Sequence, residues 1–279
     1  ANNEVAETAS AGDEVSVFLD RTPFYAESGG QIGDNGTIKT EMGLVNVTDC
    51  IKVIGGKIAH IGTVAEGSIS VGDTASAEID RVRRLSTSRN HSATHLLQKA
   101  LRTVLGTHVE QAGSYVTPDR LRFDFTHFAA MTAEEIQQVE DIVNEKILES
   151  LPITATQESI EDARKLGAMA LFGEKYGNIV RVVNMGGYSI ELCGGAHLDN
   201  TAQVGSFKIV SESGIASGVR RIEALTGAAA LKYYQQQEET LKAVCKAVKA
   251  TPDNMLKRVE TMIAEQKQTA KELESLKAK

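Results

Sequence analysis

Two short clusters of histidine and cysteine are the residues of this sequence best suited to chemistry. His91 and His95 are four positions apart, and Cys193 and His197 have the same spacing later in the chain. On a helix, side chains at positions i and i+4 lie one above the other, so both imidazoles can face one metal ion. The second cluster encloses two glycines, which let the backbone turn tightly enough to bring thiolate and imidazole together.

This set of three histidines and one cysteine predicts zinc, because Zn²⁺ accepts mixed nitrogen and sulfur ligands in tetrahedral geometry. The alternative is two surface histidines and a cysteine that serves as a small buried hydrophobe. Four of the nine cysteine and histidine residues fall into these two clusters, which favours the metal. Four protein ligands typify a structural site, whereas a catalytic zinc keeps one position open, and the sequence leaves both interpretations standing. No glutamate follows His91 directly, so the His-Glu-x-x-His pattern of zinc peptidases is absent.

The elements that must position these residues form three regions. Residues 1–84 contain short alternating or β-branched runs punctuated by Gly, Asp and Asn, which predicts a small β-barrel. Residues 85–227 mix helical and strand patterns, and we expect an α+β core that holds the metal. Residues 228–279 have a helical apolar stripe that needs a partner, typical of a coiled-coil-like arm. The predicted fold class is therefore α+β, with an N-terminal barrel and a C-terminal helical arm leading to a further domain.

Within the core, the pattern predicts how the first histidine pair is carried. A helical pattern begins at residue 88, where Ser88 or Asn90 can cap the start. Apolar residues then recur at helical spacing over residues 97–105, and Gly106 follows where a C-cap belongs. A hairpin follows, with Leu121, Phe123 and Phe125 on one face and charged residues on the other. Thr132 and Glu135 then form a capping-box pattern at the start of a second amphipathic helix.

The net charge of −7 conceals a change of sign along the chain. Residues 1–80 carry 4 basic and 13 acidic side chains, whereas residues 81–127 carry 8 basic and 3 acidic ones. The overall charge argues against indiscriminate nucleic-acid binding, and we expect no DNA partner. An anionic partner would meet segment 81–127, the alternative being an ordinary solvated cluster of charge.

Cysteine usage and hydropathy indicate the compartment. Cys50, Cys193 and Cys245 are too few and too scattered for a disulfide framework, so we expect a reducing compartment, the cytoplasm. No run approaches the roughly 18 apolar residues of a membrane span, and no signal-peptide pattern is present. Because the sequence starts at Ala1 without an initiator Met, we expect a processed chain or a piece of a longer protein.

Two further segments could contact a ligand. The run from Ser28 to Gly36, which includes Gly29, Gly30 and Gln31, lacks the Gly-Lys-Ser/Thr ending of a phosphate loop, and no helix pattern follows it. We interpret it as a turn-rich connection whose Gly-Gly-Gln part can approach a ligand closely. Arg220 and Arg221 lie beside a flexible loop and suit phosphate contact, or equally a structural salt bridge.

Taken together, these motifs resemble the editing region of bacterial alanyl-tRNA synthetases. The resemblance covers residues 13–227 in the family's order and is carried by RTPFYAESGGQIGD (21–34), the His91/His95 helix, CGGAH (193–197) and GIASGVRRIEALTG (214–227). The two metal half-motifs also occur in the threonyl-tRNA synthetase editing domain. The glycine-rich opening and the Arg-Arg-Ile-Glu-Ala segment favour the alanine family.

The resemblance implies a hydrolase that deacylates tRNA(Ala) mischarged with serine or glycine, with Zn²⁺ at His91, His95, Cys193 and His197. Thr94 and Gln111 match positions that face the family's editing pocket and help to distinguish serine from alanine. The domain that attaches alanine using ATP would precede Ala1. The expected partners are the acceptor end of tRNA(Ala) and a second copy of the chain through the helical arm. Candidate tRNA contacts are Arg81, Arg83, Arg84, Arg89, Arg220 and Arg221.

Two alternatives to an editing segment of the synthetase remain. One is a free-standing deacylase of the same superfamily that acts in trans. The other is a tRNA-binding and dimerisation module whose zinc is only structural.

Overall fold

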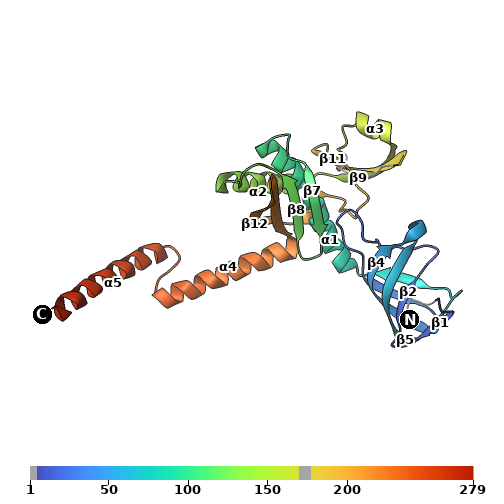
Figure 1. Cartoon of the computed structure of the whole chain (residues 1–279), viewed down its shortest axis with the longest axis horizontal. Helices are drawn as coiled ribbons and strands as arrows, with labels where there is room; N and C mark the ends of the chain where they lie inside the picture. The colour runs from blue at the N-terminus through green and yellow to red at the C-terminus, as the bar shows by residue number, and fades with distance from the viewer. Residues whose placement is uncertain (1–4, 170–176, 279) are drawn as a thin grey trace. The chain divides into compact units, whose positions relative to one another are not determined.

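The computed structural model describes residues 5–169 and 177–278. The chain divides into two compact units, Ala1–Ala230 and Leu231–Lys279. The first unit combines helices with antiparallel sheets, so the mixed helix and sheet content that the sequence predicted is confirmed (Figure 1). Among the described residues, no helix is long and apolar enough to cross a membrane.

Residues 5–80, here called the β-module, form an antiparallel sheet in the order β1-β5-β4-β3-β6, and β2 also pairs with β5. Its core contains Phe24, Ile38, Val45, Val47 and Val64, all buried. The strands are β1 (Thr8–Ser10), β2 (Glu14–Val17), β3 (Gly36–Lys39), β4 (Gly43–Lys52), β5 (Ile58–Ser70) and β6 (Ser76–Ile79).

The barrel expected for this region is not confirmed, because the sheet stays open. β1 and β2 both pair with β5, and no pairing among the described residues joins β6 back to either of them. β6 is only four residues long, and the chain leaves it directly into a helix that begins at Arg81. Short alternating runs predict strands, but they do not reveal whether the outermost strands meet.

That helix, α1 (Arg81–Leu105), carries the first histidine pair. Asp80 caps it by accepting a hydrogen bond from the backbone N–H of Arg83, and Gly106 ends it with φ of 115°. α1 therefore starts seven residues before residue 88, where the sequence pattern predicted the helix to begin. The sequence pattern missed these first turns because they do not face the core and lack an apolar stripe. The domain boundary expected between residues 84 and 85 falls inside this helix.

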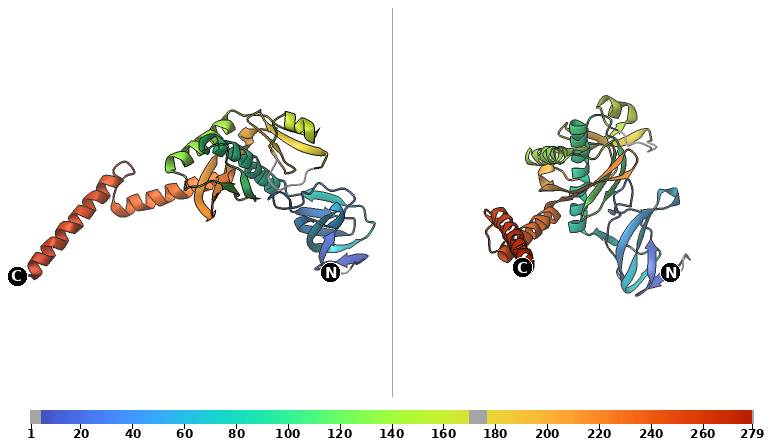
Figure 2. Two further views of the ribbon diagram at one scale, coloured as in Figure 1. Left: turned by 45° about the horizontal axis from the view of Figure 1, so that its top comes forward. Right: turned by 60° about the vertical axis from the view of Figure 1, so that its left-hand side comes forward.

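Residues 81–226, here called the α+β core, contain two further sheets. The four-stranded sheet has the order β12-β13-β8-β7, and α1 and α2 pack with it around a core that includes Leu97, Leu101, Phe123, Phe125 and Phe207 (Figure 2). The predicted hairpin and capping box are both confirmed. The elements are β7 (Gln111–Val116), β8 (Leu121–Thr126), α2 (Ala133–Leu148), β12 (Phe207–Ala216) and β13 (Val219–Thr226).

The three-stranded sheet, in the order β11-β10-β9, leads to the second half of the metal cluster. β11 (Ser189–Leu192) ends immediately before Cys193. β9 (Ile153–Ser159), α3 (Ile160–Lys165) and β10 (Ile179–Met185) complete this part. A 3₁₀ turn (Thr201–Val204) then returns the chain to β12.

Two helices make up the helical arm, α4 (Gly227–Val248) and α5 (Met255–Lys277). α5 has no buried residue, and large apolar side chains along both helices are exposed. These include Leu231, Leu241, Val244, Leu256, Ile263 and Leu276. The helices that the sequence predicted are present, and their coiled-coil pairing stays a prediction.

Candidate metal centre

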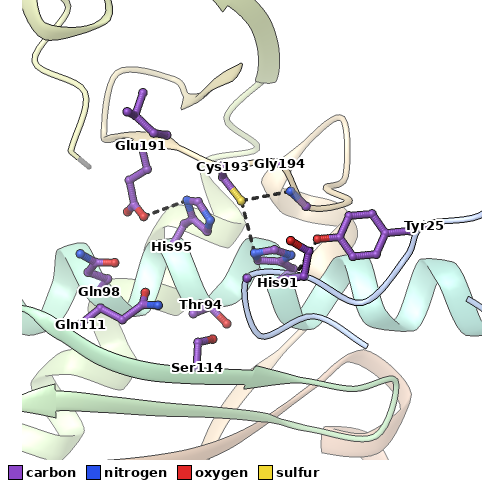
Figure 3. A pocket seen from close by; sticks show the side chains of 14 residues that line it. Tyr25, His91, Thr94, His95, Gln98, Gln111, Ser114, Glu191, Cys193 and Gly194 are labelled. Atoms are coloured by element: carbon purple, nitrogen blue, oxygen red, sulfur yellow. Dashed lines mark hydrogen bonds and ion pairs between the residues drawn. The ribbon is translucent and has the colours of Figure 1, made fainter. Parts of the chain in front are cut away.

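The structure brings His91, His95, Cys193 and His197 together. One ligand atom from each lies within 4.8 Å of all the others. The Sγ of Cys193 is 3.4 Å from Nε2 of His91 and 3.3 Å from Nε2 of His197. Helix geometry supplies the first pair, and the loop after β11 carries the second pair close to it. Figure 3 shows His91, His95 and Cys193 of this group.

A separate side chain contacts the Nδ1 of each imidazole ring. The Nδ1 of His91 donates to Oε1 of Gln31 at 2.7 Å, and Nδ1 of His197 is 3.1 Å from Oγ of Ser92. The Nδ1 of His95 lies 3.1 Å from Oε2 of Glu191, without the alignment of a good hydrogen bond. Engaging Nδ1 leaves Nε2 as the nitrogen that each ring offers to a metal.

Burial keeps these rings in the neutral form that binds metal. It lowers the pKa of His91 and His197 well below the usual value, assisted by neighbouring imidazoles and by the positive charge of Arg181. Burial and Arg181 lower the pKa of His95 to about 3. A neutral imidazole has a free lone pair at neutral pH, so no proton must leave these rings before a metal binds.

The loop that carries Cys193 is held by hydrogen bonds to its backbone. Arg181 donates through Nη1 to the carbonyl oxygens of Cys193 (3.0 Å) and Gly195 (2.7 Å), while the Gly195 N–H approaches the Cys193 sulfur at 3.3 Å. Gly195 is required for close approach, because a Cβ there would lie 2.0 Å from Cε1 of His91. The second glycine of the Cys-Gly-Gly-Ala-His motif thus makes room for the ligand from α1.

The donor set fits zinc. Three neutral imidazoles and one cysteine converge, and the separations allow a single ion to contact all four ligand atoms. A neighbouring side chain lies against the Nδ1 of each ring, on the side away from the ligand atom. His91 and His95 are buried, whereas Cys193 and His197 are partly exposed. His91, His95 and Cys193 also line a pocket, so three of the four groups face it.

That pocket has a volume of about 130 Å³, room for a few water molecules or a small acyl group. Thr94 and Gln111, the residues proposed to read the amino acid, both line it, as do Gln98 and Ser114. In Figure 3, Tyr25 lies at one end of the pocket and Gln98 and Gln111 at the other, with His91, His95 and Cys193 between them. The Thr94 hydroxyl donates to the backbone carbonyl of Asn90 at 2.8 Å, so its oxygen lone pairs remain to accept.

The glycine-rich loop lies where the sequence suggested, close to the site. Gly29 lines the pocket, and Gln31 is fully buried against His91. Gly30 has φ of +81°, and a Cβ on it would lie 2.3 Å from the carbonyl oxygen of Ser114. This loop is a close-packed turn, as its lack of a phosphate-loop ending indicated.

Most of the candidate tRNA-contacting arginines already have partners within the protein. Arg84 pairs with Asp34, and Arg89 donates to the carbonyl oxygen of Gln203. Arg220 pairs with Glu212 and Arg221 with Asp124, so the structural salt bridge, one of the two interpretations of this pair, is present. Arg120 and Arg122, on the charged face of the hairpin, also meet carboxylates. Arg81 is exposed and Arg83 partly so, both on the first turn of α1.

Sequence reasoning missed Glu191, Ser92 and Arg181. A signal was available for Glu191, because it and Ser189 occupy the buried face of a strand where apolar residues are expected. Their side chains hydrogen-bond each other at 2.8 Å, and burial raises the pKa of Glu191 to about 8. Ser92 sits inside the His-Ser-Ala-Thr-His motif, and nothing in its pattern distinguishes it from a helix residue.

Comparison with known families matches two stretches of the chain to aminoacyl-tRNA synthetases. Residues 1–83 match the family described as tRNA synthetases class II (A). Residues 180–223, which include Cys193 and His197, match the threonyl and alanyl tRNA synthetase second additional domain. The chain thus contains parts of two domains of this class of protein.

Individual relatives narrow the class to one family. The chain is 58% identical to the alanine–tRNA ligase of Acetivibrio thermocellus over 277 residues, which are 99% of this chain and 32% of that protein. It is 53% identical to the enzyme of Thermoanaerobacter sp. (100% and 32%) and 51% identical to that of Clostridioides difficile (100% and 32%). The chain belongs to the alanine–tRNA ligase family and spans about a third of the length of the curated relatives it matches. The resemblance drawn from the motifs is confirmed.

Proposed function

We propose that this chain forms the editing site of an alanine–tRNA ligase, which uses zinc to hydrolyse tRNA(Ala) mischarged with serine or glycine. The observation that carries the proposal is the convergence of His91, His95, Cys193 and His197. Three of these groups, His91, His95 and Cys193, line a pocket that Thr94 and Gln111 also line. The match to the threonyl and alanyl second additional domain supports it.

Hydrolysis of the aminoacyl ester requires the protein mainly to position the reacting groups. An aminoacyl ester is already activated, so hydrolysis needs a placed water molecule and stabilisation of a developing negative oxygen. A zinc ion held by the four ligands would supply positive charge to a substrate oxygen or amine. The small pocket beside the ligands holds the aminoacyl group next to that charge and limits the water that can enter.

Selection of serine over alanine must come from polar groups, because alanine is smaller than serine and cannot be excluded by size. The Thr94 hydroxyl oxygen has lone pairs to accept a hydrogen bond from a serine hydroxyl, since its own hydrogen is directed to Asn90. The Gln111 amide, at the start of β7, offers both a donor and an acceptor to the same pocket. Glycine, which lacks a side chain, fits the same space.

We further propose how the remaining parts serve this reaction. Arg81 and Arg83, the least engaged of the candidate arginines, would meet acceptor-stem phosphates, and binding would weaken strongly with salt. The expected division into residues 1–84, 85–227 and 228–279 would give a β-module, an editing core and an arm, with the first boundary moved to the start of α1 at Arg81. The exposed apolar stripe of the arm would pair with a second copy of the chain, and the reaction would take place in the cytoplasm.

The deciding experiment is deacylation of Ser-tRNA(Ala) by this chain and by Cys193→Ala, alongside metal analysis of both. We expect hydrolysis by the unchanged chain with stoichiometric zinc, and loss of both in the variant. Cys245→Ala, in α4, is the matched control and should keep both. If the unchanged chain binds zinc and tRNA but does not hydrolyse the ester, the proposal is wrong and a binding module with structural zinc replaces it.

A further inference from the structure

We propose that Gln31 is a positioning residue that fastens the two halves of the metal centre together, so that metal binding also fixes the β-module against the α+β core. The inference rests on the metal site of the proposed function. It does not require that the site hydrolyse anything.

The geometry around Gln31 joins three separate parts of the chain. Its side chain is fully buried, and its Oε1 accepts from Nδ1 of His91 at 2.7 Å and from the backbone N–H of Ala196 at 2.9 Å. One amide oxygen has two lone pairs, enough for both donors. His91 belongs to α1, and Ala196 lies between the two ligands of the loop, so a single atom of the β-module holds both halves.

Each of these hydrogen bonds has a consequence for metal binding. The bond to His91 fixes the proton on Nδ1 and directs Nε2 toward the sulfur of Cys193, 3.4 Å away. The bond to Ala196 restrains the loop midway between Cys193 and His197. Without Gln31, the ring of His91 could rotate and the loop would lose an anchor.

The backbone around Gln31 is held on both sides, whereas the buried Nε2 of its side chain has no hydrogen-bond partner in the described part of the structure. Ser28 and Gln31 exchange two backbone hydrogen bonds, of 3.0 and 3.1 Å, across a tight turn. The carbonyl oxygen of Gly30 accepts from the N–H of Val116 at 2.7 Å, and the Ile32 N–H donates to the carbonyl oxygen of Val116, so the turn is attached to the end of β7. The glycine-rich run therefore positions the side-chain amide of Gln31.

A second attachment lies two helical turns away. The Arg84 guanidinium pairs with Asp34 and donates to the carbonyl oxygen of Pro23 at 3.0 Å. Arg84 and His91 are seven residues apart, so they share a face of α1 about 10 Å apart along its axis. Segment 23–34 is thus fixed to α1 at two points, and one of these points is a metal ligand. By linkage, an ion that requires His91 in place stabilises this docking.

The test uses zinc affinity and Co²⁺ absorption spectra of the full chain, with no tRNA present. Gln31→Met keeps the shape of the side chain but removes the acceptor, and we expect zinc affinity to fall by about 10- to 100-fold. Gln31→Glu restores an acceptor oxygen and should recover most of the affinity and the unchanged Co²⁺ spectrum. Gln138→Met, on the exposed face of α2, is the control.

A measurement on the unchanged chain guards against a variant that fails to fold. Hydrogen exchange with and without zinc should show slower exchange at amides 28–34 when the metal is bound. The inference is overturned if Gln31→Met binds zinc within threefold of the unchanged chain, or if zinc leaves exchange at 28–34 unaltered. A chain that passes both tests but fails to deacylate Ser-tRNA(Ala) would contradict only the proposed function.

Discussion

The two halves of the metal centre are positioned in different ways. His91 and His95 lie on a long helix whose Ala93, Leu96 and Leu97 are completely buried, so regular backbone geometry alone places the two rings on one side. Cys193 and His197 lie in an irregular loop whose position depends on contacts with residues from elsewhere. These contacts come from Gln31, Ser92 and Arg181.

The helix half, with His91 and His95, is therefore positioned by local structure, whereas the loop half, with Cys193 and His197, is positioned by tertiary contacts. The helix half should keep its shape in the absence of metal, because its hydrogen bonds and packing do not involve the ion. The loop half orders three residues between the ligands with little secondary structure, at a cost in conformational entropy that a bound metal would help to offset. Four changes would break or sharpen this contrast.

The largest effect is expected from Gly195→Ala in the loop half. The new Cβ would overlap the His91 ring, so the loop and the helix could not approach each other as they do now. We expect zinc affinity to fall by about 100-fold, measured by competition with a chromophoric chelator. Gly194→Ala is the matched control, since a Cβ there meets no atom within 4 Å. Equal behaviour of the two variants would contradict the close approach.

Removal of the metal tests the contrast without a mutation. After dialysis against a chelator, hydrogen exchange should become faster at amides 193–198, while amides of α1 around His91 and His95 should stay protected. The helix remains packed on the hydrophobic core, whereas the loop loses a link that joins Cys193 to His197. Matching loss of protection in both halves would show that the helix half also depends on the ion.

A smaller loss is expected for Arg181→Met. This change removes two hydrogen bonds to loop carbonyl oxygens but leaves every ligand in the chain. Zinc affinity should fall by about 10-fold, at the low end for groups that support metal ligands. Arg164→Met, exposed on α3, controls for the loss of a positive charge. An unchanged affinity would assign the support of the loop to Gln31 and Ser92 alone.

The smallest effect on zinc is expected from Thr94→Val, in the helix half between the two histidines. Its hydroxyl contacts the backbone of Asn90 and lines the pocket, so zinc affinity should stay within about twofold. Discrimination between serine and alanine should fall instead, by about 10-fold, because the hydrogen-bond acceptor is lost. Rates with Ser-tRNA(Ala) and Ala-tRNA(Ala) would measure it, and retained discrimination would remove Thr94 from the recognition step.

The same contrast explains what could be predicted from the sequence. The spacing of His91 and His95 indicated a shared helix face, and the alternation of Leu121, Phe123 and Phe125 indicated a buried hairpin face, because local periodicity determines both. The partners of the loop half could not be predicted this way. Gln31 is distant from the loop in sequence, and Arg181 lies on a neighbouring strand, β10. Only the folded chain brings these two side chains to the loop that holds Cys193 and His197.

Contacts that the apolar pattern does not record account for the incorrect expectations. Closure of the β-module would require its outermost strands to meet, and the early start of α1 depends on Asp80 as a cap rather than on an apolar stripe. Arg220 and Arg221 illustrate the same limit. Sequence could not choose between phosphate and carboxylate partners, and the structure shows carboxylates on neighbouring strands.

The long separation between the parts of the metal centre has a consequence for the order of events during synthesis. α1 and the hairpin that follows it can form as soon as they leave the ribosome, since their contacts are local. The centre itself joins Gln31 to residues that end at His197, so two histidines must wait for about a hundred further residues to be made. A metal could therefore meet all four ligands only after His197 has been made.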